Sequence, residues 1–139
     1  MSSITTTPYA ITTTLAADFD TVVARVRTEL AAEGFGVLTE IDVQATLEQK
    51  LAVRGQRYLI LGACNPPLAH RGLTIEPDLG VLLPCNVVVR QDGDAVRVSA
   101  MEPDAAMRLA ANPALAPLAA EARGRLERAL AQLTREDTP

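Results

Sequence analysis

Few side chains in this 139-residue sequence have types and spacing suited to chemistry. The chain contains one histidine, His70, and two cysteines, Cys64 and Cys85. An asparagine follows each cysteine directly, Asn65 in the first case and Asn86 in the second. No glycine-rich phosphate-binding fingerprint, Gly-x-Ser-x-Gly elbow or Cys-x-x-Cys pair is present. These five residues are therefore the candidate binding or reactive residues, and the sequence assigns a catalytic role to none of them.

Cys64 has the surroundings expected of a reactive thiol. It precedes Asn65, a favoured N-cap, and Pro66, which is tolerated in a first helical turn, so a helix is predicted to begin here. The unpaired N–H groups and the dipole at a helix start favour a thiolate. His70 lies in the second turn of the same helix, where it could approach Cys64. Three interpretations stay open: a small buried hydrophobe, a reactive thiol, and a metal or haem ligand.

Cys85 follows Pro84 and alternates with Val87, which predicts that its side chain faces the core. If the strands that carry the two cysteines pair, the thiols are neighbours, and a disulfide needs Cα atoms within about 7 Å. Cys64, Cys85 and His70 supply at most three metal ligands, whereas a closed structural zinc site takes four. An open Cys₂His site, or one shared between two subunits, is the metal centre they would allow. Because desolvation raises the pKa of a thiol, Cys64 is predicted to be the more reactive cysteine.

The remaining polar clusters have structural explanations. Asp42 is predicted to cap a helix rather than to form an acid pair with Glu40. The last helix interleaves acidic and basic residues, which predicts a solvent-facing surface formed by Glu121, Arg123, Arg125, Glu127 and Arg128.

The strands that would position these residues follow from hydrophobic alternation and turn signals. They are predicted over residues 8–15, 36–43, 58–64, 81–90 and 95–101. The near-continuous hydrophobicity of residues 58–64 predicts a central strand that is buried on both faces. Pro84 predicts a bulge or an edge within residues 81–90. Gly93 is expected to supply a positive φ in the hairpin turn that follows.

Helices are indicated by apolar residues at three- and four-residue spacing, over residues 19–33, 43–52, 66–73, 103–112 and 115–133. Asp18 or Asp20 can cap the first helix, and Gly34 can end it. The first and last helices each carry an apolar stripe, which needs one apolar surface to cover it. The sequence therefore predicts an α+β fold, with one mainly antiparallel sheet and the long helices on one face. A sheet covered on one face exposes apolar residues, so a homodimer is expected.

Length and composition bound the class of protein. The chain suits a single domain over residues 1–139, with an ordered core at about 8–133 and frayed termini. Hydrophobic residues make up 48%, and the formal net charge is −4, which argues against a nucleic-acid binder. No secretory signal and no apolar run of about 20 residues is visible, so neither export nor a membrane partner is expected. A cytoplasmic location with reduced cysteines follows as the expectation.

Three segments together resemble a known family: GFGVLTEIDV at 34–43, LGACNP at 61–66 with Ala69-His70, and LLPCNV at 82–87. Their order and spacing are similar to the family called domain of unknown function 302, over about residues 9–133. The resemblance implies an α+β domain similar to one half of the TATA-binding protein saddle, without a DNA role. It also implies a homodimer, and it supplies no reaction. It marks as signature positions Cys64, Asn65, Pro66, Pro84, Cys85 and Asn86.

The convergence of the unusual residues leads to one function hypothesis and two alternatives. The first is a small dimeric module that binds or senses a small ligand, a sulfur species or a metal near Cys64–Asn65 and Cys85–Asn86. The second is an enzyme that uses Cys64 as a nucleophile or sulfur carrier. The third is a purely structural or protein-interaction domain whose cysteines belong to the core. The sequence identifies no particular cofactor and leaves metal or haem ligation by these residues open.

Overall fold

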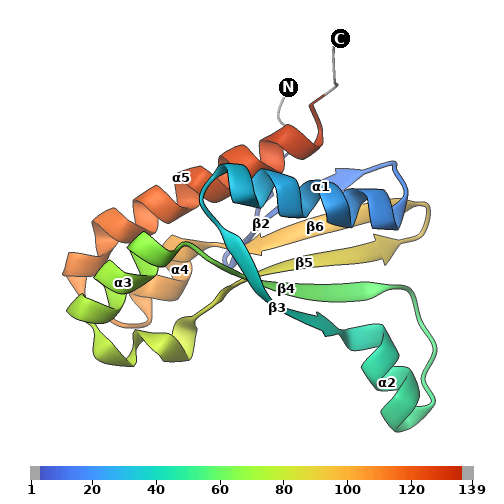
Figure 1. The fold of residues 1–139 in the computed structure, drawn as a ribbon, viewed down its shortest axis with the longest axis horizontal. Helices are drawn as coiled ribbons and strands as arrows, with labels where there is room; N and C mark the ends of the chain where they lie inside the picture. The colour runs from blue at the N-terminus through green and yellow to red at the C-terminus, as the bar shows by residue number, and fades with distance from the viewer. Residues whose placement is uncertain (1–3, 136–139) are drawn as a thin grey trace.

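A six-stranded antiparallel sheet forms the frame of the computed structural model, which describes residues 4–135. The strand order is β1-β2-β6-β5-β4-β3, and every neighbouring pair is antiparallel. Figure 1 shows the strands fanning across the molecule. The strand bounds are β1 Thr5–Thr6, β2 Ala10–Leu15, β3 Gly36–Asp42, β4 Tyr58–Cys64, β5 Cys85–Asp92 and β6 Ala95–Met101.

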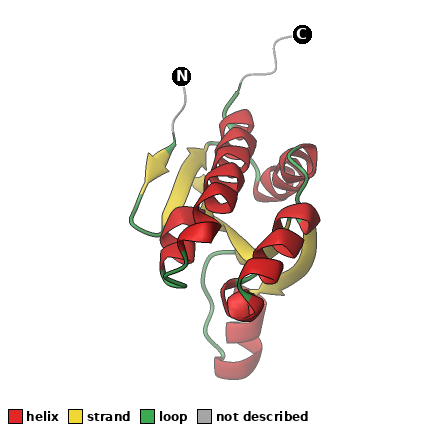
Figure 2. Ribbon diagram, turned by 90° about the vertical axis from the view of Figure 1, so that its left-hand side faces the viewer, coloured by secondary structure: helices red, strands yellow, loops and turns green. Residues whose placement is uncertain are grey.

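Two long helices lie side by side over one face of this sheet, which confirms the predicted α+β class (Figures 1 and 2). These are α1 Phe19–Ala32 and α5 Ala116–Leu133. The shorter helices are α2 Val43–Leu51, α3 Pro66–Ile75 and α4 Pro103–Arg108, with 3₁₀ turns η1 Pro77–Leu82 and η2 Pro113–Leu115. None of the helices described between residues 4 and 135 is long and apolar enough to cross a bilayer.

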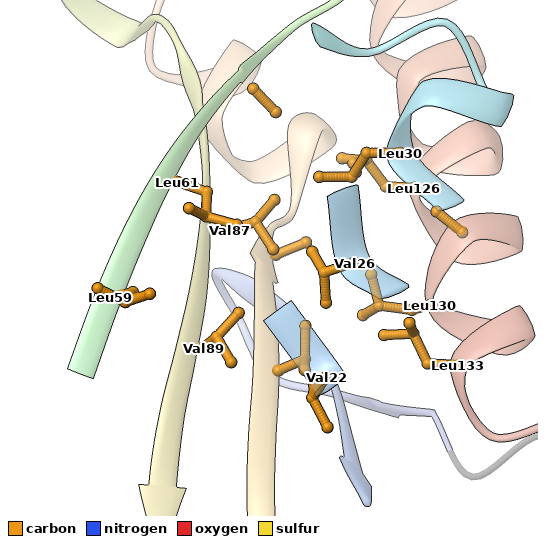
Figure 3. Packing of buried hydrophobic residues seen from close by; sticks show 14 of the residues in the cluster. Val22, Val26, Leu30, Leu59, Leu61, Val87, Val89, Leu126, Leu130 and Leu133 are labelled. Atoms are coloured by element: carbon orange, nitrogen blue, oxygen red, sulfur yellow. The ribbon is translucent and has the colours of Figure 1, made fainter. Parts of the chain in front are cut away.

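The main core lies between the two long helices and the sheet (Figure 3). Every third or fourth residue of α1 is buried, as its apolar stripe predicted. The stripe of α5 is buried at Leu118, Ala119, Leu126, Leu130 and Leu133, whereas Ala122 is half-buried. Full burial of one such side chain contributes roughly 1.5–3 kcal/mol. The members labelled in Figure 3 are Val22, Val26, Leu30, Leu59, Leu61, Val87, Val89, Leu126, Leu130 and Leu133.

Local signals set most of the element ends where the sequence predicted them. The Asp18 carboxylate accepts a hydrogen bond from the Thr21 backbone N–H at 3.1 Å and so caps α1. The predicted left-handed stop after this helix is present, since Gly34 has φ of 87°. Gly93 has φ of 62° in the turn between β5 and β6, as the hairpin required. Asp42 caps α2 through the Ala45 backbone N–H at 2.8 Å.

The segment 81–90 is not one long strand, so that prediction was wrong. Val81 and Leu82 belong to η1, and β5 begins only at Cys85. Pro84 has no N–H to give to a ladder, and Pro77 starts a tight turn that continues to Leu82. The short apolar run Val81-Leu82-Leu83 is compatible with a 3₁₀ turn as well as with a strand, because either element can bury the side chains on one of its faces and expose the others.

Two further expectations are corrected by the topology. The strand over Tyr58–Cys64, β4, lies next to the edge strand rather than at the centre, and Tyr58, Ile60 and Cys64 are only half-buried. Helices pack on one face of this strand, so the other face is not covered. The helix that follows Asn65 runs to Ile75 rather than to Leu73.

The edge strand β3 extends away from the two long helices toward α2 (Figure 1). Its ladder with β4 shifts register between Val37 and Thr39, which marks a bulge. The chain then enters α2, which lies at the far end of β3 from the long helices (Figure 1) and has no buried residue.

Candidate functional site

An apolar cavity of about 340 Å³ lies between the ends of β4 and β5 and a second, smaller core. The smaller core joins α3, η1, η2 and α5 through Leu68, Leu79, Leu115 and Leu118. Both cysteines line the cavity, which we call the thiol cavity. Its other walls are almost entirely apolar and include Phe35, Leu38, Ala63, Ala69, Leu73, Leu83, Pro84, Met107, Ala119 and Ala122.

The sheet register brings the two cysteines together, as the sequence allowed. Cys64 is the last residue of β4, and Cys85 is the first residue of β5. Cys85 pairs across the ladder with Ala63, the residue directly before Cys64. Both thiols are free and half-buried. The two side chains therefore meet the same cavity from neighbouring strands.

Cys85 is a protonated thiol at neutral pH. Burial, with a smaller contribution from the neighbouring charge of Cys64, raises the pKa of its thiol from 9.0 to about 11. Since the thiolate is the nucleophile, Cys85 is poorly suited to attack at neutral pH.

Asn65 is a buried structural cap. Its Oδ1 accepts a hydrogen bond from the Leu68 backbone N–H at 3.3 Å, which fixes the start of α3 as predicted. Its Nδ2 donates to the Glu33 carbonyl oxygen at 3.4 Å, at the end of α1. Asn65 also lines the thiol cavity, but these two bonds already use both ends of its amide.

His70 lies on α3, is exposed and is not among the residues that line the thiol cavity. Its carbonyl oxygen accepts a hydrogen bond from the Thr74 hydroxyl at 2.8 Å. Within residues 4–135, no group of three or more His, Cys, Asp or Glu side chains is placed to hold a metal ion. The described part of the chain thus gives Cys64 and Cys85 no third ligand.

Asn86 is separated from the thiol cavity. It is exposed, pairs with Gly62 across the ladder, and lines a second hollow of about 480 Å³. Three strongly exposed apolar side chains surround this hollow, Tyr9, Val81 and Leu109. Of the two Cys-Asn dipeptides, Cys64, Asn65 and Cys85 therefore line the thiol cavity, and Asn86 does not.

Sequence reasoning missed the small residues that leave the cavity open. Ala119 and Ala122 were recognised only as members of the apolar stripe of α5. Their small volume, in a stripe otherwise rich in leucine, is the signal that could have indicated space beside this helix. Met107 comes from α4, far along the chain from the cysteines, and no local pattern pointed to it.

The charged residues singled out in the sequence form helix caps and ion pairs, and two of the arginines on α5 also join this helix to other elements. Glu40 forms an ion pair with Arg27 at 3.0 Å and does not form an acid pair with Asp42. Two arginines of the predicted charged face of α5 form ion pairs with residues four positions away, Arg123 with Glu127 and Arg125 with Glu121.

These two arginines also tie α5 to other elements. Arg123 Nη1 donates to the buried carboxylate of Glu102 at 2.8 Å, and Glu102 in turn caps α4 through the Asp104 and Ala105 backbone N–H groups. Arg125 donates to the Glu33 carbonyl oxygen at 3.1 Å. The helix face is therefore only partly solvent-facing.

These features define a small α+β domain in which two helices cover one face of an antiparallel sheet. Two thiols line an apolar cavity at one end of that sheet. The chain belongs to the family described as domain of unknown function DUF302, whose family model matches residues 11–133. It is similar to the crystal structure of an uncharacterised conserved DUF302 protein from Bacillus stearothermophilus, with a TM-score of 0.83 and 28% identity. That match covers 91% of this chain and 98% of the other. Comparison with curated proteins finds no match.

Proposed function

We propose that the protein is a binding module that holds a small apolar ligand in the thiol cavity. The observation that carries this proposal is a cavity of about 340 Å³ whose walls are nearly all aliphatic or aromatic. Sites for small molecules typically measure roughly 300–1,000 Å³ and are lined mainly by apolar side chains with a few polar groups. The cavity is at the lower end of this range, which favours a compact ligand.

The chemistry of the walls narrows the kind of ligand. Asn65 is engaged by backbone groups, so the two thiols and the hydroxyl of Thr39 are the polar side-chain groups left to face the cavity. A thiol is a soft, polarisable group and a weak hydrogen-bond donor. An apolar body with a sulfur or another soft group directed at Cys64 and Cys85 fits these walls better than a charged metabolite does.

The proposal is tested by calorimetric titration with two uncharged probes, indole and 1-hexanol. We expect binding with a negative heat-capacity change, the marker of apolar burial. Ala122→Phe places a ring in the cavity and should abolish binding, whereas Ala120→Phe, on the exposed side of the same helix, should not. Ala69→Leu fills the cavity from α3 and serves if Ala122→Phe does not fold. Absence of binding at millimolar probe, or equal binding by Ala122→Phe and the parent, would overturn the proposal.

A thiol-dependent enzyme is the second candidate function, and one observation favours it. Cys64 stands immediately before the capped start of α3, where the backbone N–H groups of the first turn favour negative charge. A substrate in the thiol cavity would lie against this sulfur. Trapping by an apolar electrophile distinguishes the two functions, since a simple binding site releases the probe on unfolding and a covalent site retains it on Cys64.

We also propose that two copies of the chain associate through the second hollow. Tyr9, Val81 and Leu109 have exposed fractions of 75%, 86% and 77%, and they surround the same hollow of about 480 Å³. A patch that carries both projecting apolar groups and a space to receive them suits a two-fold interface, in which the same surface meets itself.

Light scattering at micromolar concentration tests this association. The parent chain should show the mass of a dimer, and Val81→Asp should reduce it to a monomer. Leu51→Asp is the matched control, because Leu51 is 67% exposed on α2, away from the hollow. A monomeric parent chain contradicts the proposal, and a dimer that is broken only by Leu51→Asp would move the interface to α2.

A further inference from the structure

The two thiols of the cavity are within reach of each other. In an antiparallel ladder, paired Cα atoms are about 4.5–5.5 Å apart and each residue advances about 3.3 Å. Cys85 pairs with Ala63, and Cys64 is one residue further, so the diagonal between the two cysteine Cα atoms is about 6 Å. Disulfides span Cα separations of about 4.4–6.8 Å.

The strand ends also let both side chains meet. In a regular strand, residues one step apart point to opposite faces, which would separate the thiols. Here Cys64 is where β4 turns into α3, and Cys85 is where β5 begins after Pro84. Both residues line the same cavity, and the charge of Cys64 acts on the thiol of Cys85.

We propose that Cys64 and Cys85 form a redox-active pair. Cys64 takes up an RS group from a low-molecular-weight disulfide RS–SR, and Cys85 then resolves the mixed disulfide. This modification site does not depend on the proposed ligand. It goes beyond binding because it makes the pair a sensor of the thiol–disulfide state of its surroundings.

The chemistry proceeds in two exchanges. The Cys64 thiolate attacks one sulfur of a disulfide RS–SR, so that a Cys64–SR bond forms, the RS–SR bond breaks, and RS⁻ leaves and takes a proton from water. Cys85 then loses its proton to water and attacks the Cys64 sulfur. The Cys64–Cys85 bond forms, the Cys64–SR bond breaks, and a second RS⁻ leaves and is protonated. Two protein thiols are oxidised, and one low-molecular-weight disulfide is reduced to two thiols.

The order of attack follows from the electrostatics of the pair. Cys85 holds its proton at neutral pH, so the first attack falls to Cys64. Once Cys64 is in a mixed disulfide it carries no charge, and its contribution to the raised pKa of Cys85 disappears. The first exchange therefore prepares the second.

The expected rates can be estimated for Cys85 alone. A rise in pKa from 9.0 to about 11 lowers the neutral-pH thiolate population roughly a hundredfold. The higher pKa makes each thiolate more nucleophilic, with a Brønsted coefficient of about 0.4–0.5, which recovers roughly a factor of eight. Folded Cys85 should therefore react about tenfold more slowly than the same thiol in unfolded protein.

The experiment uses the reduced chain of residues 1–139, oxidised glutathione and acid-quenched intact-mass measurements. The parent chain should pass through a single glutathione adduct and end as an intramolecular disulfide, two hydrogens lighter than the reduced chain. Cys85→Ser should stop at a stable single adduct. Cys64→Ser should react severalfold more slowly when folded than in concentrated urea. The difference should be smaller than the tenfold expected for Cys85 beside Cys64, because the variant lacks the neighbouring charge that adds to the raised pKa. In concentrated urea the two single-cysteine variants should react alike.

Several outcomes would overturn the proposal. These are a parent chain that ends as a stable mono- or di-adduct, disulfides that form only between chains, and a folded Cys64→Ser variant that reacts as fast as Cys85→Ser. Peptide mapping of the oxidised parent chain locates the bond directly, so the test remains decisive if one serine variant does not fold.

Discussion

The side-chain amide of Asn65 occupies the space next to Gly34 that any other residue would need. A Cβ built on Gly34 would lie 2.9 Å from the Asn65 Nδ2 atom. The same amide bonds to the Glu33 carbonyl oxygen and to the Leu68 backbone N–H. The end of α1 and the start of α3 are therefore held together by one asparagine and one glycine, directly beside Cys64.

Gly34→Ala is expected to lower the free energy of unfolding by about 2 kcal/mol. An L-residue at φ of 87° is strained by roughly 1–2 kcal/mol, and the added Cβ would also displace Asn65. Gly80→Ala is the control, since a Cβ there meets nothing within 4 Å and needs no positive φ. Urea unfolding monitored by circular dichroism measures both. Equal losses for the two variants would contradict the role of the Gly34–Asn65 contact.

Two N-caps of the same type should differ in their effect on global stability. Asn65→Ala should cost about 2 kcal/mol, the upper part of the range for a lost cap, because Asn65 is buried and joins two helices. Asp42→Ala should cost a few tenths of a kcal/mol in global unfolding, because α2 has no buried residue and is expected to unfold locally at little cost. Urea unfolding gives the two values, and amide exchange should show local loss in α2. A loss of global stability in Asp42→Ala as large as that in Asn65→Ala would mean that α2 is packed against the rest of the fold, and would contradict this prediction.

The stability of the protein should fall as the pH rises from about 9 to about 11. In the unfolded chain the Cys85 thiol ionises near its ordinary value of 9.0, whereas burial raises the pKa of the folded thiol to about 11. Between these values the unfolded state binds fewer protons than the folded state, so the free energy of unfolding decreases with pH. Below pH 9 both states are protonated, and the full stability is present.

Urea midpoints across this pH window check the expectation. Cys85→Ser should flatten the slope. Cys64→Ser should lower the folded pKa of Cys85, read from the ultraviolet absorbance of the thiolate, because the neighbouring charge is gone. An unchanged slope in Cys85→Ser would assign the pH dependence to other groups.

Glu102 and Arg123 should show energetic coupling of about 1 kcal/mol in a double-mutant cycle. Glu102→Ala should cost about 3 kcal/mol, because it removes the cap of α4 and a charge-assisted bond from a buried position. Arg123→Ala should cost less, since the Arg123 side chain is 32% exposed and Glu102 keeps two backbone donors. Additive losses within about 0.3 kcal/mol would show that the pair contributes nothing beyond its separate parts.

The sequence indicated those parts of the fold whose causes are local. Asp18, Asn65 and Gly93 each determine a helix start or a turn through their own side chain or backbone, and the structure has each where it was predicted. The residues 81–84 were misassigned because a short apolar run does not distinguish a strand from a 3₁₀ turn, and only packing against Leu79 and α3 decides between them.

The candidate site could be predicted only in part for the same reason. The cysteines were recognised by type, and their proximity depended on one inferred strand pair. The cavity beside them depends on Met107 and Ala119, which come from elements at the other end of the chain. The position of His70 in α3 was predicted from the sequence, but the direction of its side chain was not. That direction depends on how α3 is rotated against α5, and this rotation leaves His70 exposed.

The bulge in β3 has a consequence for the solubility of the protein. As an outermost strand, β3 offers unpaired backbone groups that could recruit a strand from another molecule and extend the sheet indefinitely. The register shift after Val37 increases the local twist of this edge strand. The carboxylates of Glu40 and Asp42 would also repel the same carboxylates on an identical incoming strand. We therefore expect no further strand to add to the sheet at β3, although β3 is exposed along most of its length.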